Sequence, residues 1–309
     1  MRLTLWGFGC GTRRQIENTH RDLVGQDREG SAEYSGGAVD LALVANRGMY
    51  LKIISYGAGV QSTALLVLSA LGQRGVPKAD YAVFADTGDE PQYIYDYLEV
   101  VTQWAKPHGL EVVTCSAGKL SEDLLETDRT FVAIPAWRPM GDGREMPMRR
   151  QCTREYKITP IEKKIRELMG YKPRQRIKEN VQVMLGISCD EASRVKPSRT
   201  GWIENSWPLI DARLYRSHCV DIVKEAGLPA PQKSSCHYCP YHSNSYFLWL
   251  KNNHPEDWQK AVDFDEAIRV KHPDDPMYVH RSLKPLGEVD LNDYQLSLFD
   301  EECEGYCGL

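Results

Sequence analysis

Three cysteines are the residues of this sequence best suited to chemistry. Cys236 and Cys239 form a Cys-x-x-Cys pair, and Cys152 lies 84 positions before Cys236. By itself such a pair fits a zinc site, a redox dithiol or half of an iron–sulfur site, because thiolates act both as ligands and as nucleophiles. Buried structural cysteine is the plainer alternative, and it is weakest for the Cys-x-x-Cys pair.

Cations surround Cys152. Arg149, Arg150 and Lys157 lie near it, and the segment from Arg144 to Lys178 carries twelve Lys or Arg against four Glu. A charge run is usually a solvated face. This run contains a cysteine and lies where an anionic substrate would be needed, so it is a candidate site for phosphate, sulfate or nucleic acid. The three cations are candidate catalytic residues, because they can neutralise an anionic substrate or stabilise the charge on a leaving group.

A glycine-rich stretch is the second candidate site. It follows a predicted strand and opens a predicted helix, where Gly57 and Gly59 permit a positive φ and let the backbone approach a ligand closely. Unpaired N–H groups and the helix dipole at such a helix start favour an anion. The stretch predicts a phosphate cradle, and an ordinary strand-to-helix turn is the alternative. The candidate nucleotide-binding residues here are Ser55, Gly57, Gly59, Val60, Gln61 and Ser62.

This stretch resembles the PP-loop of the ATP pyrophosphatases. It is closer to the variant in phosphoadenosine-phosphosulfate (PAPS) reductases, where Gly-Ile/Val-Gln replaces Gly-x-Asp, as in residues 59–62 here. The resemblance covers about residues 50–309 and extends to three further motifs in the family's order. It implies a Rossmann-like adenine nucleotide alpha hydrolase fold that binds ATP or adenylyl sulfate.

Two of these motifs imply further nucleotide contacts. Asp86, Thr87 and Gly88 follow the second predicted strand, as a similar Asp-Thr-Gly does in PAPS reductases, and Asp86 is expected to hold adenosine, ribose or Mg²⁺. Residues 186–194 resemble the family's Gly-Ile-Arg-x-x-Glu-Ser-x-Arg. Ser188 stands where the family has Arg, a departure that affects one phosphate or sulfate contact. The matching positions are Gly186, Glu191 and Arg194.

The cysteines resemble the iron–sulfur branch of the sulfonucleotide reductases, where Cys-Cys is followed after about eighty residues by Cys-x-x-Cys. Gln151 replaces one cysteine of the first pair. The resemblance implies a [4Fe–4S] cluster, with one iron left open as in related tRNA-thiolating enzymes or with a fourth ligand from the tail. Zinc is the competing metal. The implied ligands are Cys152, Cys236, Cys239 and Cys307.

The tail allows a rival role for Cys303. Assimilatory reductases end with Glu-Cys-Gly, whose cysteine attacks sulfur, and Glu302-Cys303 is similar although Glu304 replaces Gly. Cys303 is therefore a candidate nucleophile as well as a candidate ligand. A nucleophilic thiol needs a nearby cation, so we expect the acidic tail to dock on the basic 144–178 segment.

Strand and helix patterns alternate from residue 50 onwards, which predicts an α/β fold with a mostly parallel sheet and ligands at the carboxyl ends of its strands. The predicted strands are 51–55, 81–85, 111–114 and 181–187. The predicted helices are 61–73, 91–106, 119–125, 159–169 and 217–226, with one or two more within 249–271, whereas 131–151 reads as irregular. We expect a poorly ordered extension (1–48), a nucleotide-binding domain (49–230) and a helical, cysteine-rich cluster-binding region with an acidic tail (231–309).

Composition limits the classes of protein. The chain has 309 residues, 42% of them hydrophobic and 26% charged, and a net charge of −5, which is typical of a globular protein without a globally basic surface. No apolar run approaches the ~20 residues of a membrane span, and the first residues do not make a secretory signal. We expect a cytoplasmic protein without membrane contact. Nine cysteines in that compartment indicate metal or redox chemistry rather than disulfides.

These observations lead us to expect an enzyme. It would reduce an adenylyl-linked sulfate, or adenylate a nucleotide or nucleic acid with release of pyrophosphate and then transfer sulfur. The missing second cysteine and Ser188 favour the latter, with nucleic acid bound by segment 144–178 and a thioredoxin-like or cysteine-desulfurase donor as partner. The alternative is a non-catalytic nucleotide-binding module with structural zinc.

Overall fold

A parallel five-stranded sheet carries the glycine-rich stretch. The computed structural model describes residues 50–126, 134–139 and 145–292, all within a single compact unit. The strand order is β3-β2-β1-β6-β7, and every neighbouring pair is parallel, which confirms the predicted α/β fold. The strands are β1 (Leu51–Tyr56), β2 (Tyr81–Asp86), β3 (Glu111–Ser116), β6 (Val181–Leu185) and β7 (Ile203–Ser206).

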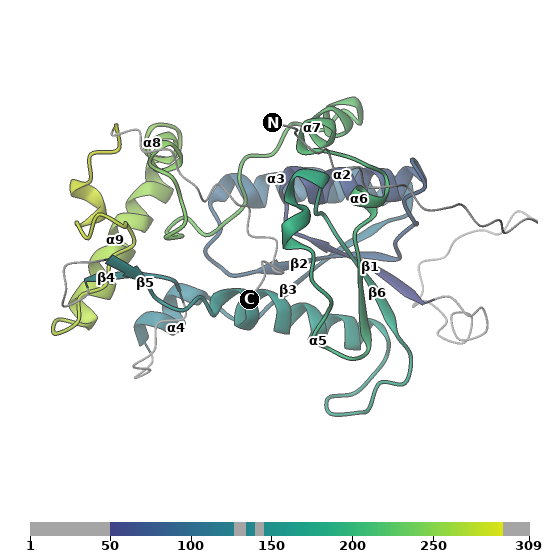
Figure 1. Cartoon of the computed structure of the whole chain (residues 1–309), viewed down its shortest axis with the longest axis horizontal. Coiled ribbons are helices and arrows are strands. Elements are labelled where there is room, and N and C mark those ends of the chain that lie inside the picture. Colours follow the sequence, from purple (N-terminus) through teal and green to yellow (C-terminus); the bar gives the residue numbers. More distant parts are fainter. Residues whose placement is uncertain (1–49, 127–133, 140–144, 293–309) are drawn as a thin grey trace, which may run out of the picture. The chain divides into compact units, whose positions relative to one another are not determined.

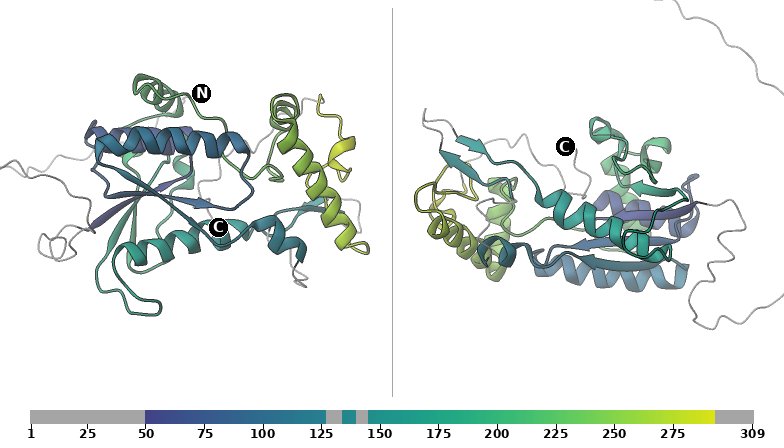
Figure 2. Two further views of the ribbon diagram at one scale, coloured as in Figure 1. Left: turned by 180° about the vertical axis from the view of Figure 1, so that it is seen from behind. Right: turned by 90° about the horizontal axis from the view of Figure 1, so that it is seen from below.

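Helices cover both faces of this sheet (Figures 1 and 2). On one face lie α2 (Val60–Leu71) and α3 (Gln92–Ala105), with α7 (Arg216–Glu225) packed on α2; on the other lies α5 (Thr159–Leu168). Successive strand residues point to opposite faces. Ile54 therefore packs with α2 and α3, whereas Ile53 packs with Ile161 and Ile165 of α5. Burial on both faces explains why these strands read as continuous apolar runs.

The ends of α2 follow from local chemistry. Gly59 is its N-cap residue, and Gly72 ends it in the left-handed conformation at φ 63°, with its N–H bonded to the carbonyls of Leu68 and Ser69. Glycine adopts this conformation at little cost, so it commonly closes a helix. Short helices complete the chain: α6 (Pro208–Asp211), η1 (Lys106–His108), η3 (Cys189–Arg194) and η4 (Leu286–Glu288).

A second hydrophobic core holds the cysteine region. Helices α4 (Leu120–Glu126), α8 (Asn244–Asn253) and α9 (Pro255–Lys271) surround it, so the 249–271 segment contains the end of one helix and a second helix. Tyr238, between the two cysteines of the Cys-x-x-Cys pair, is fully buried there and stacks on Phe264 at 3.7 Å. Tyr156 and Ile134 also belong to this core. The cysteine region is therefore built partly from residues far earlier in the chain.

Segment 131–151 differs from the irregular structure that we expected. Its described residues form an antiparallel pair, β4 (Trp137–Pro139) and β5 (Glu145–Pro147), and Trp137 exchanges main-chain hydrogen bonds of 2.8 Å with Tyr278. Strand β7 was also missed. The short, proline-containing or polar strands of β4, β5 and β7 carry no alternating pattern, and the bridge of Trp137 to Tyr278 joins residues distant in sequence. Helix α5 starts at Thr159, as predicted, and a π-helical turn (η2, Thr153–Ile158) leads into it.

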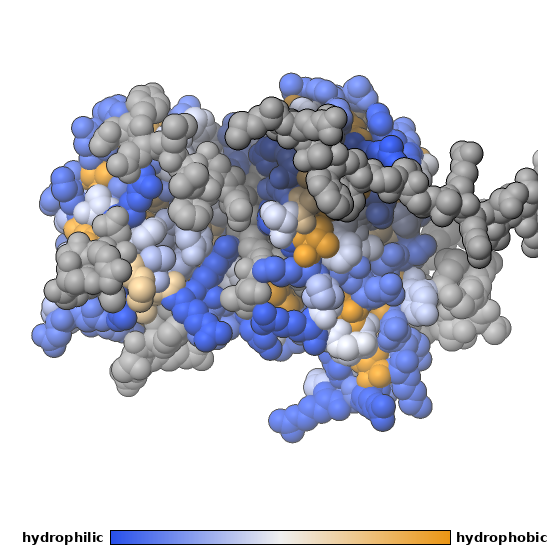
Figure 3. All heavy atoms as spheres, in the orientation of Figure 1, coloured by the Kyte–Doolittle hydropathy of each residue, from blue (hydrophilic) through white to orange (hydrophobic). Residues whose placement is uncertain are grey.

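The distribution of hydrophobic residues on the surface and along the helices bears on whether a segment spans a membrane. On the face seen in Figure 3, hydrophilic residues predominate and hydrophobic residues form small, separate spots. Across the described residues, no helix combines the length and apolarity needed to span a membrane.

Candidate active site

The glycine-rich loop between β1 and α2 is shaped by Ser62. Its hydroxyl accepts hydrogen bonds from the N–H groups of Gly57 (3.3 Å) and Gly59 (3.2 Å) and donates to the carbonyl of Gly59 (3.1 Å). The backbone differs from the prediction in one respect. The left-handed residue is Ala58, at φ 56°, whereas Gly59 is extended at φ −94°. The small glycines flank a strained position instead of occupying it.

Gly186, at the end of β6, packs against this loop. A Cβ atom at position 186 would lie 2.7 Å from the backbone N and Cα of Ser62, closer than real Cβ atoms approach. Only glycine lets the end of β6 come this near the first turn of α2. The residue that the family resemblance matched at 186 therefore lies directly beside the loop.

Gln61 is hydrogen-bonded to a cation that was not predicted, Arg216. Its side chain is fully buried, and its Oε1 accepts a hydrogen bond of 2.9 Å from Arg216. Because a guanidinium can only donate, Nε2 of Gln61 must point elsewhere, and it has no hydrogen-bond partner within the described part of the chain.

Arg216 is also tied to the turn after β6. Its backbone N–H donates to Asp190 (3.1 Å), which accepts a second hydrogen bond from the hydroxyl of Ser188 (2.6 Å). Arg216 thus links the turn that lacks the family's arginine to the first turn of α2. Arg216 was not predicted from the sequence. Ser188 was the available signal, because it stands where PAPS reductases have arginine and another segment could supply the cation.

The loop after β2 touches both candidate sites. Asp86 accepts hydrogen bonds from the N–H of Gly88 (2.8 Å) and the hydroxyl of Tyr95 (2.9 Å). The next residue, Thr87, lies with its hydroxyl 3.3 Å from the sulfur of Cys236. The candidate nucleotide residues at the end of β2 are therefore in direct contact with the Cys-x-x-Cys pair.

Glu191 and Arg194 form an ion pair of 2.8 Å in η3. Their side chains are only 16% and 7% exposed, so the pair is not the solvated surface pair that their spacing alone would allow. It stabilises the turn that follows β6, on the same edge of the sheet as the glycine-rich loop.

One pocket collects the three predicted cysteines. Cys152, Cys236 and Cys239 all line it, together with Thr87, Arg150 and Lys157. We call it the cysteine pocket. Cys152 is the N-cap residue of η2, which turns it and Lys157 toward the Cys-x-x-Cys segment. Arg149 does not line the pocket and is exposed. Cys303 and Cys307 lie outside the described residues.

Lys157 is a buried cation at this pocket. Its side chain is 10% exposed, and Nζ lies 3.3 Å from Oε1 of Glu90, whose side chain is fully buried. Burial and then the Glu90 carboxylate raise the pKa of the Cys236 thiol well above its usual value, whereas Lys157 lowers it. A thiolate at Cys236 therefore depends on Lys157 or on a bound cation.

Asp89 connects the two candidate sites through buried hydrogen bonds. Its carboxylate accepts from the hydroxyl of Tyr238 (2.7 Å) and from both the N–H and the hydroxyl of Ser121 (2.7 and 2.8 Å). Its carbonyl accepts from the N–H of His237 (3.0 Å). Asp89 and Glu90 were not among the predicted site residues. The sequence feature that could have identified them is their position, because these two acidic residues directly follow the Asp-Thr-Gly motif.

The donor set of the cysteine pocket fits a soft metal centre. Three thiols with cationic neighbours suit an iron–sulfur cluster or zinc. Over the described ranges, no three His, Cys, Asp or Glu side chains are already placed as ligands of one metal ion. The pocket thus has the right residue types, and binding would draw the cysteines together.

Two solved structures are similar to this chain. One is a phosphoadenylyl-sulfate (PAPS) reductase from Candida auris in a phosphate complex, with 14% identity and a TM-score of 0.41, covering 63% of this chain and 85% of that chain. The other is the U34-tRNA thiolase NcsA from Methanococcus maripaludis with its [4Fe-4S] cluster, with 12% identity and a TM-score of 0.39, covering 71% of each chain. No protein-family model and no curated protein matches the sequence.

Proposed function

We propose that this protein is a PAPS reductase-like enzyme that binds ATP or adenylyl sulfate at the loop between β1 and α2 and performs redox or sulfur-transfer chemistry at the cysteine pocket. The contact between Thr87 and Cys236, at 3.3 Å, carries this proposal. It joins a residue of the nucleotide motif to a residue of the cysteine motif that is 149 positions away. Chemistry at a bound nucleotide would thus be within reach of the cysteines.

The nucleotide's phosphates would bind at the start of α2. The first N–H groups of a helix have no intrahelical partner, and the helix dipole adds positive potential there. Arg216 adds a formal charge beside Gln61. Lys157 and Arg150, which line the cysteine pocket, would stabilise negative charge on a leaving group.

A [4Fe–4S] cluster is the cofactor that the cysteine pocket suits best. Cys152, Cys236 and Cys239 would hold it, and it would supply electrons or an iron that binds sulfur. Lys157 would offset part of the negative charge of the thiolate ligands. A structural zinc needs four protein ligands, whereas three cysteines line this pocket, which favours a cluster with one iron left open.

ATP-dependent adenylation followed by sulfur transfer is the reaction that we favour. An acceptor oxygen would attack the α-phosphorus of ATP, the bond to the β-phosphate would break, and pyrophosphate would leave. A sulfur nucleophile would then displace AMP from the acceptor. Ser188 and Gln151, which depart from the sulfonucleotide reductase pattern, make sulfate reduction the second candidate.

The test measures both reactions on anaerobically purified full-length protein. We expect pyrophosphate release from ATP in the presence of a nucleic-acid acceptor, and its loss in Lys157→Met. Lys78→Met is the matched control, since Lys78 is exposed just before β2, at the opposite end of that strand from Asp86, and should leave the rate unchanged. Sulfite release from adenylyl sulfate would indicate reduction instead. Failure to bind or consume either nucleotide would contradict the proposal.

A further inference from the structure

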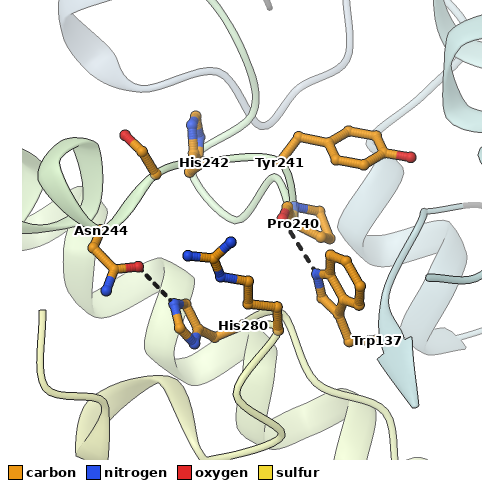
Figure 4. A pocket seen from close by; sticks show the side chains of 8 residues that line it. Trp137, Pro240, Tyr241, His242, Asn244 and His280 are labelled. Carbon is orange, nitrogen blue, oxygen red and sulfur yellow. Dashed lines mark hydrogen bonds between the residues drawn. The ribbon is translucent and has the colours of Figure 1, made fainter. Parts of the chain in front are cut away.

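A second pocket adjoins the cysteine pocket, and Pro240 lines both (Figure 4). Three distant segments contribute to it. Trp137 comes from β4, Tyr241 follows the Cys-x-x-Cys pair, and His280 and Arg281 follow α9. Nothing in the proposed nucleotide or cluster chemistry uses this pocket. We call it the aromatic pocket.

Its aromatic walls are held in place by the surrounding backbone. Trp137 is fixed by its two main-chain hydrogen bonds to Tyr278 and by its indole N–H, which donates to the carbonyl of Pro240 (3.4 Å). The ring of Tyr241 has the guanidinium of Arg150 5.3 Å from its centroid. Arg150 also lines the cysteine pocket, so it connects the two pockets. A planar group can stack on the face of such a ring.

The aromatic pocket is positively charged. Arg281 lines it, and no Asp or Glu is among its lining residues. Within the described ranges Arg281 makes no ion pair or hydrogen bond. His280 adds no charge at neutral pH, because burial lowers its pKa to about 4. His280 instead fixes the turn that carries Arg281, since its Nε2 bonds Asn244 (3.0 Å) and its Nδ1 accepts from the N–H of Ser282 (3.2 Å).

We infer that the aromatic pocket binds one nucleotide of a single-stranded nucleic acid, with its base against Trp137 and Tyr241 and its phosphate at Arg281. Stacking on aromatic rings beside a cation is how proteins hold single strands. A nucleotide bound there would lie next to the cysteine pocket, across Pro240. The inference rests on the proposed function and names its acceptor. A free mononucleotide has the same chemistry, so the test must separate the two sources.

The experiment measures fluorescence anisotropy of short labelled single-stranded DNA and RNA on the full-length protein at two salt concentrations. Arg281→Gln should weaken binding about tenfold and reduce the slope of log affinity against log salt by about 0.7, the share of one phosphate contact on a single strand. Arg281→Lys should restore most of the affinity because it keeps the charge. Lys284→Gln is the control, since Lys284 is exposed on the same segment and lines neither pocket. Thermal melting verifies that each variant folds.

Each outcome decides one proposal. Equal binding by Arg281→Gln and Lys284→Gln, or no strand binding by the wild-type protein, would overturn this inference even if ATP is consumed. Displacement of the labelled strand by AMP alone at equal affinity would also overturn it, because the pocket would then serve a free mononucleotide. Loss of strand binding in Arg281→Gln would support it even if the protein failed to bind ATP, which would overturn only the proposed function.

Discussion

The glycine-rich loop and the cysteine pocket are built in opposite ways. In the loop, one hydroxyl joins residues that are neighbours in sequence, since Ser62 bonds Gly57 and Gly59. In the cysteine pocket, the decisive contacts join distant segments. Side-chain hydrogen bonds join Thr87 to Cys236, Tyr238 to Asp89, and Lys157 to Glu90. The loop needs only β1 and α2 to take shape, whereas the pocket needs the second core.

This difference predicts that the two sites can be damaged separately. A local motif keeps its geometry as long as its strand and helix are formed. A pocket assembled from five segments fails when any long-range contact is lost, because buried polar groups left without partners are costly. Substitutions in the pocket should therefore affect stability and sulfur chemistry together. Those at the loop should affect mainly nucleotide binding.

The largest effect is expected from Cys236→Ser. Replacing this thiol should abolish turnover and leave ATP affinity, measured by calorimetry, unchanged, because among the described residues Cys236 is hydrogen-bonded to the nucleotide motif at Thr87 alone. Cys219→Ala is the control for cysteine removal, since Cys219 of α7 is buried in the core between α7 and α2. Retained turnover in Cys236→Ser would remove the cysteine pocket from the reaction.

Asp89→Asn should reduce the free energy of unfolding by about 2–4 kcal/mol, because a buried carboxylate with three charge-assisted hydrogen bonds is replaced by an amide that can accept only through one oxygen. Chemical denaturation measures the change. Asp263→Asn is the matched control: Asp263 is exposed and its one hydrogen bond among the described residues is from Gln259, so a change below about 0.5 kcal/mol is expected. Equal, small losses in both variants would mean that Asp89 does not hold the two sites together.

Gly186→Ala should reduce the free energy of unfolding by about 1–3 kcal/mol. The new methyl group would overlap the backbone of Ser62, beside the glycine-rich loop, and push β6 away from α2. Nucleotide affinity should fall with it. At Gly201, by contrast, an added Cβ meets nothing within 4 Å, so Gly201→Ala should be neutral in the same denaturation assay. A neutral Gly186→Ala would show that the close approach is not needed.

Arg216→Gln should weaken ATP binding about tenfold, because it removes one charged contact worth about 1.4 kcal/mol to a phosphate. AMP, with a single phosphate, should lose less. Arg216→Lys keeps the charge and should retain part of the affinity, whereas Lys224→Gln, exposed on the same helix, should change nothing. If calorimetry gives the wild-type affinity for Arg216→Gln, Arg216 does not replace the arginine missing at position 188.

Local patterns explain how much of the fold could be predicted. The strands near 51–56, 81–86, 111–116 and 181–185 were found because their apolar runs are continuous, and α2 because its apolar residues recur at helical spacing, although Gly72 ends it two residues before the predicted end at 73. Strand β7 and the β4–β5 pair were missed because these strands have only three or four residues each and no alternating pattern, and because the bridge of Trp137 to Tyr278 is long-range.

The candidate site divides in the same way. The residues of the glycine-rich loop could be identified in sequence, although the left-handed backbone falls on Ala58 instead of a glycine. The grouping of Cys152 with the Cys-x-x-Cys pair was predicted from family resemblance, and the cysteine pocket contains all three. Arg216, Asp89 and Glu90 could not be predicted, because their partners lie far away in sequence. Arg149 was predicted beside the site and is exposed outside it.

The central claim is that the cysteine pocket holds an iron–sulfur cluster beside the nucleotide loop. Iron, zinc and acid-labile sulfide analysis of anaerobically purified protein, with its visible spectrum, tests it most directly. We predict about four iron and four sulfide per chain, and their loss in Cys152→Ser, Cys236→Ser and Cys239→Ser. About one zinc per chain without sulfide would contradict the claim and make the cysteines structural.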